Sequence, residues 1–92
     1  SCDVPLLSPQ DGAVVTGQNL ELTWEAHPLA SFYRIHIWDK DYTDILDAPR
    51  VNGTAYTVSQ VIASGAYTWY ITAYDATETE IARSDFYEFT VP

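Results

Sequence analysis

The sequence predicts an all-β domain, an antiparallel sandwich of seven short strands. Most apolar residues alternate with polar ones at a period of two, which is typical of half-buried strands. The 92 residues include seven Tyr, three Trp and three Phe but no Met, and aromatic and β-branched residues favour pleated sheet. Turn-forming residues recur between the segments at the regular spacing of a sandwich. A chain of this length forms one domain.

The first three predicted strands follow from these signals in order. Pro5 and Pro9 confine the first strand to a sheet edge, because proline has no N–H group to give to a central ladder. The second strand, Leu20–Glu25, alternates apolar and charged or polar residues without interruption. The third, Phe32–Trp38, places Tyr33, Ile35 and Ile37 on one face of the sheet.

Four more strands complete the prediction. They are Ile45–Val51, Thr54–Val58, Gly65–Tyr74 and Phe86–Val91. Pro49 weakens the first of these, and the turn dipeptide Asn52-Gly53 separates it from the next. Asp75–Asp85 is predicted as a polar loop. In the longest strand, Trp69 belongs to the inward-facing set, and Trp24 does so in the second strand, so both indoles are expected in the core.

The charge of the chain excludes some partners. Asp and Glu number 13 against 4 Lys and Arg, which gives a net charge of −9. This charge would repel phosphate backbones, so nucleic acid is not expected as a partner. No run of about 18 apolar residues exists, so no membrane span is expected.

Cys2 is the single cysteine, so no intrachain disulfide can form. Two interpretations of this residue stay open. It is either a plain thiol near the start of the chain or the lipid-bearing residue of a processed bacterial lipoprotein, in which case it anchors the domain to a membrane.

Several motifs in order resemble the fibronectin type III family, in the form found in bacterial surface and secreted proteins. They are Val4-Pro5-Leu6-Leu7-Ser8-Pro9 with Asp11-Gly12, Leu20-x-Leu22-x-Trp24, Tyr33-x-Ile35-x-Ile37, Gly53-Thr54-x-Tyr56-x-Val58 and Gly65-Ala66-Tyr67-x-Trp69-x-Ile71-x-Ala73-x-Asp75. Val61 and Tyr67 have the spacing of the family's tyrosine corner, although Val61 stands where the family has Leu. This departure and the interrupted fourth strand leave an immunoglobulin-like variant open.

The resemblance implies one fibronectin type III-like domain over residues 1–92, with residues 1–3 as a flexible lead-in. It also implies a non-catalytic module of a larger secreted or cell-surface protein, acting as a spacer or as a protein-interaction or adhesion domain. The expected location is extracellular or at the cell surface.

The sequence shows no catalytic or cofactor motif. His27 and His36 are the only imidazoles, and no Gly-x-Ser-x-Gly elbow, phosphate-binding glycine loop or zinc-ligand set is present. We therefore expect no enzyme activity and no cofactor.

The strongest candidate binding site is aromatic. If the strands pair as the family implies, His36 and Trp38 neighbour Tyr70 and Tyr74 on the outer face of one sheet. Exposed aromatic rings stack on sugars and anchor protein partners, so the alternative function is a carbohydrate-binding module. Partners are then a protein or a surface polysaccharide. The competing interpretation is a set of cross-strand pairs that stabilise the sheet.

An acidic loop gives a weaker candidate. Asp39, Asp41 and Asp44 supply oxygen atoms of the kind that calcium prefers, but the glycine and terminal glutamate of an EF-hand are missing. A solvated charged loop is the favoured interpretation, and no metal site is expected.

Overall fold

The computed structural model describes residues 4–92, and in this range the chain forms strands and no helix. The strands are β1 (Leu6–Ser8), β2 (Ala13–Val14), β3 (Glu21–Trp24), β4 (Phe32–Trp38), β5 (Arg50–Val51), β6 (Ala55–Thr57), β7 (Gly65–Tyr74), β8 (Glu80–Arg83) and β9 (Tyr87–Val91). Within the described residues there is therefore no helix that could cross a membrane.

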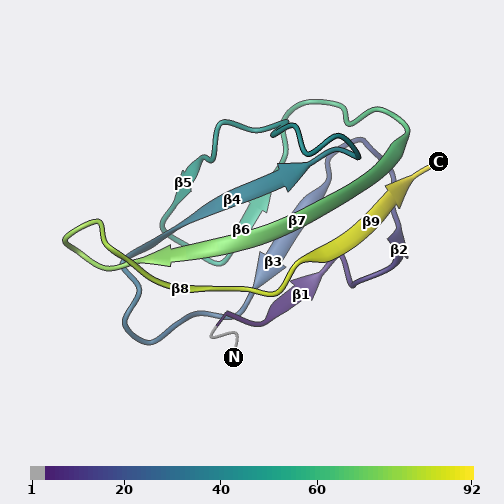
Figure 1. Cartoon of the computed structure of the whole chain (residues 1–92). Coiled ribbons are helices and arrows are strands. Elements are labelled where there is room, and N and C mark those ends of the chain that lie inside the picture. The colour runs from purple at the N-terminus through teal and green to yellow at the C-terminus, as the bar shows by residue number, and fades with distance from the viewer. Residues whose placement is uncertain (1–3) are drawn as a thin grey trace.

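Two sheets pack face to face as a β-sandwich (Figure 1). The smaller sheet has the strand order β1-β3-β6, and the larger has the order β2-β9-β7-β4-β5, with β8 paired to β7. Every pairing is antiparallel except that of β2 with β9, which is parallel. The predicted all-β sandwich is confirmed, with this one parallel pair added.

The strand count differs from the prediction of seven, because residues 4–92 form nine segments. Two of these segments, β2 and β8, were not predicted. β2 follows the turn around Gly12 and pairs with β9 in the larger sheet, whereas β1 belongs to the smaller one. The prediction of Asp75–Asp85 as a polar loop was wrong in its second half, because Glu80–Arg83 forms strand β8 and pairs with β7. Of the predicted strand Ile45–Val51, only β5 is formed.

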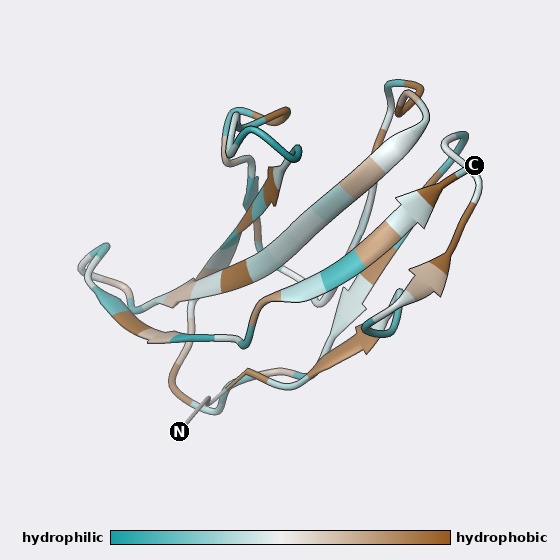
Figure 2. Ribbon diagram, turned by 45° about the vertical axis from the view of Figure 1, so that its right-hand side comes forward, coloured by the Kyte–Doolittle hydropathy of each residue, from teal (hydrophilic) through white to brown (hydrophobic). Residues whose placement is uncertain are grey.

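The core lies between the sheets and consists of the alternating residues that the sequence indicated. The largest core side chains that are less than 2% exposed are Trp24, Trp69, Phe89, Leu22, Ile35, Ile37, Ile71, Val4 and Val58. Phe32 is equally buried, but it lies on the outer face of the larger sheet, stacked on Tyr74. Burial of each large apolar side chain contributes roughly 1.5–3 kcal/mol to stability. A shift of one residue in the pairing of two strands would expose these side chains, so the alternation also fixes the strand register. Figure 2 shows this alternation along β9, where brown and paler or teal residues follow one another.

The loop before β7 contains the expected tyrosine corner. The hydroxyl of Tyr67 donates a hydrogen bond to the carbonyl of Ala63 at 2.7 Å. The apolar residue that this loop contributes to the core is Ile62, which is 3% exposed, whereas Val61 is 69% exposed. The assignment of Val61 to this role was therefore wrong by one residue. The N–H of Ile62 is bonded to the carbonyl of Gly17 at 2.8 Å, and this bond turns the Ile62 side chain inward.

A bulge separates β8 from β9 and decides which way Phe86 points. Thr72 is opposite Arg83 and Trp69 is opposite Tyr87, so two residues of β7 face three of the last segment. Ser84 stabilises the bulge by two hydrogen bonds to Ile71: its Oγ accepts the Ile71 N–H at 2.9 Å, and its N–H donates to the Ile71 carbonyl. A bulge of this kind redirects side chains, and Phe86 is directed to the outer face.

Candidate binding face

The pairing of β4 with β7 brings the four predicted aromatic residues to one face of the larger sheet. In this register His36 is opposite Tyr70, Phe32 is opposite Tyr74 and Trp38 is opposite Thr68. Residues directly opposite each other in an antiparallel pair share a face. The inward residues of both strands fill the core, so these side chains lie on the outer surface.

The rings fall into two groups. At one end, the His36 and Tyr70 rings stack with their centroids 4.4 Å apart, and Trp38 meets the Tyr70 ring edge-on at 5.2 Å. At the other end, Tyr74 stacks on Phe32 with centroids 5.0 Å apart. The structure therefore brings His36, Trp38 and Tyr70 into direct contact and places Tyr74 in a separate pair.

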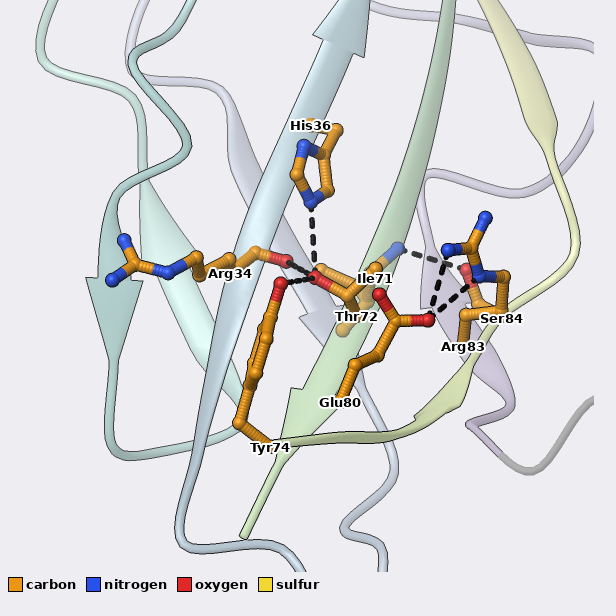
Figure 3. A network of polar contacts seen from close by, with 8 residues as sticks. All are labelled: Arg34, His36, Ile71, Thr72, Tyr74, Glu80, Arg83 and Ser84. Carbon is orange, nitrogen blue, oxygen red and sulfur yellow. Dashed lines mark hydrogen bonds and ion pairs between the residues drawn. The ribbon is translucent and has the colours of Figure 1, made fainter. Parts of the chain in front are cut away.

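Thr72 joins the two groups through polar contacts (Figure 3). Its Oγ1 lies 3.0 Å from Nε2 of His36 and donates to the Tyr74 hydroxyl at 3.3 Å. Thr72 is 2% exposed although it is on the outer face, because the His36 and Tyr74 side chains that contact it cover it. Much of this face is thus a second small packed layer, as the competing interpretation of cross-strand pairs requires.

Two aromatic residues that were not among the candidates extend the first group. The ring centroid of Phe86 lies 5.4 Å from that of Trp38 and 4.9 Å from that of Tyr70. The ring centroid of Tyr42 lies 5.9 Å from that of Trp38. Phe86 is 52% exposed and Tyr42 is 78% exposed. We call His36, Trp38, Tyr42, Tyr70 and Phe86 the aromatic cluster. The alternation of the last strand, with Tyr87 inward, already indicated an outward Phe86, whereas no sequence signal places the loop residue Tyr42.

Charges near the cluster shift two of its groups. Burial lowers the pKa of His36 below its ordinary value, opposed by the nearby carboxylates of Asp44 and Glu80. Burial also raises the pKa of Tyr70, and the negative charge of Asp44 acts in the same direction. Both shifts favour neutral rings, so the surface offers uncharged aromatic groups flanked by the carboxylates of Asp44 and Glu80 and by the guanidinium of Arg83.

The acidic loop after β4 is a hairpin turn closed by Asp39. Its Oδ1 accepts the N–H groups of Asp41 and Thr43 at 2.8 and 3.0 Å. The hairpin after β7 repeats the arrangement, with Asp75 Oδ1 accepting the N–H groups of Thr77 and Thr79.

Within residues 4–92 no three His, Cys, Asp or Glu side chains converge in a way that could hold a metal ion. The structure does not bring Asp39, Asp41 and Asp44 together as a ligand set. Cys2 lies outside the described residues.

The histidines have structural contacts. Nδ1 of His27 accepts the Leu29 N–H at 3.1 Å in the β3–β4 loop, and His36 is bonded to Thr72. Two hollows on the surface are small: one of about 240 Å³ lies between Asp39 and Tyr67, and one of about 280 Å³ lies between Asp44 and Tyr56. Pockets for small-molecule ligands usually measure roughly 300–1,000 Å³.

The sequence matches no family model and none of the curated proteins. The structure is similar to that of an Fn3-like protein from Clostridium thermocellum, with a TM-score of 0.65 and 27% identity over 88% of this chain and 86% of that one. It is also similar to the fibronectin(III)-like modules of Clostridium thermocellum CbhA, with a TM-score of 0.65 and 20% identity over 96% of this chain and 94% of that one.

A third similar structure is CopC from Methylosinus trichosporium OB3b, with a TM-score of 0.63 and 17% identity over 96% of this chain and 92% of that one. At this identity the likeness concerns the fold alone. The three matches cover 88–96% of this chain. The names of the two from Clostridium thermocellum agree with the family that the motifs resemble. The chain is therefore a fibronectin type III-like domain.

Proposed function

We propose that this domain is a non-catalytic linking module of a larger extracellular or cell-surface protein, holding the parts on either side of it apart. The observation that carries this proposal is the placement of the first and last strands. The carbonyl of Pro5 accepts the N–H of Glu25, where β3 finishes. Val91 pairs with Gly65, where β7 begins. These are opposite ends of the sandwich (Figures 1 and 2).

The shape of the domain supports this role. Its longest dimension is 38 Å, against 24 and 22 Å across. A chain that enters at one end and leaves at the other separates its neighbours by about the long axis. The core between the sheets makes the spacer rigid, unlike a flexible Gly/Ser linker.

The chemistry of the described residues favours a module without catalysis. Neither imidazole has a hydroxyl nucleophile and an orienting carboxylate in the arrangement that acyl transfer uses. His36 is hydrogen-bonded to the Thr72 hydroxyl, but Thr72 is 2% exposed, so its hydroxyl is out of reach of a substrate. The similar structures include modules that are named as such, those of CbhA, and this supports a place within a longer chain.

The linking role can be tested on the parent protein by small-angle scattering. Deletion of residues 4–92 should shorten the maximum dimension of the parent by about the 38 Å long axis. Replacement of the same residues by a Gly/Ser linker should leave a broader distribution of distances. An unchanged maximum dimension after deletion would contradict the proposal, because the module would then lie beside its neighbours.

The absence of catalysis is tested separately with the purified domain. It should hydrolyse no generic ester, peptide or glycoside substrate above the buffer rate. Activity above the buffer rate that is lost when the domain is unfolded would reject the non-catalytic role. Detection of the parent protein in the culture fluid or the surface fraction, and not inside the cell, tests its location.

A further inference from the structure

The two aromatic groups on the outer face of the larger sheet differ in whether arginine side chains cover them. Over the Phe32–Tyr74 pair the chain supplies its own cations: the Arg50 guanidinium carbon lies 3.8 Å from the Phe32 ring centroid, and that of Arg34 lies 5.8 and 5.9 Å from the centroids of Phe32 and Tyr74. Within residues 4–92, no Lys or Arg lies over a ring of the aromatic cluster. One half of the face is capped by arginine and the other half is open.

The cluster also differs from the other exposed apolar side chains. The remaining large ones, Leu7, Val14, Leu29 and Val61, are aliphatic. Tyr42 and Phe86 are the exposed aromatic ones among the described residues, and both contact Trp38. Tyr42 reaches this place from a turn position with φ of 63°, which is costly for a bulky residue. Phe86 reaches it through the bulge that Ser84 holds.

Asp44 supplies the main negative charge at the open half of the face. It pairs with Trp38 in an isolated bridge, and its carboxylate is the strongest charge acting on His36 and Tyr70. Glu80 acts on both rings in the same direction, and the guanidinium of Arg83 opposes it. Glu80 is already paired with Arg83 at 2.8 Å. The Asp44 carboxylate has no hydrogen bond or ion pair within the described part of the chain. The net charge of −9 adds a long-range attraction for cationic partners.

We propose that the aromatic cluster and Asp44 form a docking surface for an arginine-bearing segment of a partner protein. A guanidinium group is planar, stacks on aromatic rings and pairs with carboxylates, so it satisfies both features of the surface at once. The arrangement of Arg50 on Phe32 shows the same contact within this chain. The proposal adds a partner to the linking role, and either can fail without the other.

The test is an NMR titration of the domain with a short peptide in which arginines alternate with Gly and Ser. We expect a saturable shift of the Trp38 indole N–H, with the signals of the buried Trp24 and Trp69 unchanged. A peptide with lysine in place of arginine should bind several-fold more weakly, because an ammonium group cannot stack as a plane. A neutral oligosaccharide should leave the Trp38 signal in place.

Three variants decide whether the surface is specific. Asp44→Asn should weaken arginine-peptide binding by about tenfold, and Phe86→Ser should weaken it at least as much. Glu21→Gln removes the same charge from the exposed face of β3 on the other sheet and should change binding little. Unshifted Trp24 and Trp69 signals in the free variants show that the fold is intact, and Asp44→Asn removes no ring contact.

Three results would overturn the proposal. Equal weakening by Glu21→Gln and Asp44→Asn, or equal binding of the lysine peptide, would mean attraction by overall charge alone. A Trp38 shift with the oligosaccharide and not with the peptide would make the cluster a sugar-binding face. No Trp38 shift with any probe at millimolar concentration would leave the rings as sheet-stabilising pairs.

Discussion

Gly17 touches the backbone of Ile62 so closely that no side chain fits between them. A Cβ atom at position 17 would lie 2.0 Å from the Ile62 carbonyl oxygen. The neighbour is backbone and is held by the hydrogen bond from its own N–H to the Gly17 carbonyl. It therefore cannot move aside without breaking the tyrosine-corner loop that begins there.

Gly17→Ala should lower the free energy of unfolding by about 2 kcal/mol through this overpacking. Gly53→Ala is the matched control, since a Cβ there meets nothing within 4 Å, and it should change stability by less than about 0.5 kcal/mol. Urea denaturation followed by Trp fluorescence measures both. Equal stability of the two variants would contradict the close contact.

His36 gives the domain a pH-dependent stability. Its pKa is lowered by burial, so the unfolded chain binds more protons at this residue than the folded one. The contribution is fully present above the unfolded value of about 6.5 and is lost as the pH falls from there through the folded pKa. Between pH 7.5 and 5.5 the melting temperature should therefore fall.

In His36→Gln this decline should be smaller, because glutamine can bond to Thr72 but does not titrate. Thermal melts at half-unit pH steps compare the two proteins. A variant with the same slope as the parent would mean that other groups cause the decline.

At the scale of single elements, period two explains most of what could be predicted. The inward sets of β4 and β7 are buried as their alternation indicated, and Trp24 and Trp69 are 1% and 0% exposed. Alternation fails where strands are interrupted, because a bulge adds a residue without changing composition. β8 was missed for that reason, and alternation indicated an outward Phe86 without placing its ring beside Trp38. Of the aromatic cluster, the sequence thus predicted His36, Trp38 and Tyr70 as candidates and missed Tyr42 and Phe86.

The bulge itself depends on the Ser84 side chain. Its Oγ accepts the buried N–H of Ile71 and donates to the Asp85 carbonyl at 2.8 Å. Ser84→Ala leaves the Ile71 N–H without an acceptor, which should cost about 1–3 kcal/mol. The Ile71 amide should also exchange faster with deuterium.

Ser59→Ala, at an exposed position in the β6–β7 loop, is the control and should change neither quantity. If Ser84→Ala keeps the Ile71 amide protected, a water or a backbone shift has replaced the hydroxyl. The bulge would then not depend on this side chain.

At the scale of the whole molecule, negative charge is poorly balanced. Within residues 4–92 the structure holds one ion pair, between Arg83 and Glu80, while acidic residues exceed basic ones by 13 to 4. The guanidinium groups of Arg34 and Arg50 are directed to the Ala48 carbonyl and the Phe32 ring instead of to carboxylates. Repulsion among the remaining carboxylates therefore acts against the compact state.

Salt should stabilise this domain at pH 7.5, where His36 is neutral in both states. Raising NaCl from 10 mM to 200 mM shortens the Debye length from about 30 Å to below 10 Å, which screens repulsion across a body whose shorter dimensions are 24 and 22 Å. The melting temperature should rise over this range, and Glu21→Lys should raise it at low salt and reduce the salt effect. A melting temperature that falls with salt would mean that favourable charge contacts outweigh the repulsion. Attraction of an arginine-bearing partner to the aromatic cluster would then have to come from the Asp44 carboxylate alone and not from the net charge.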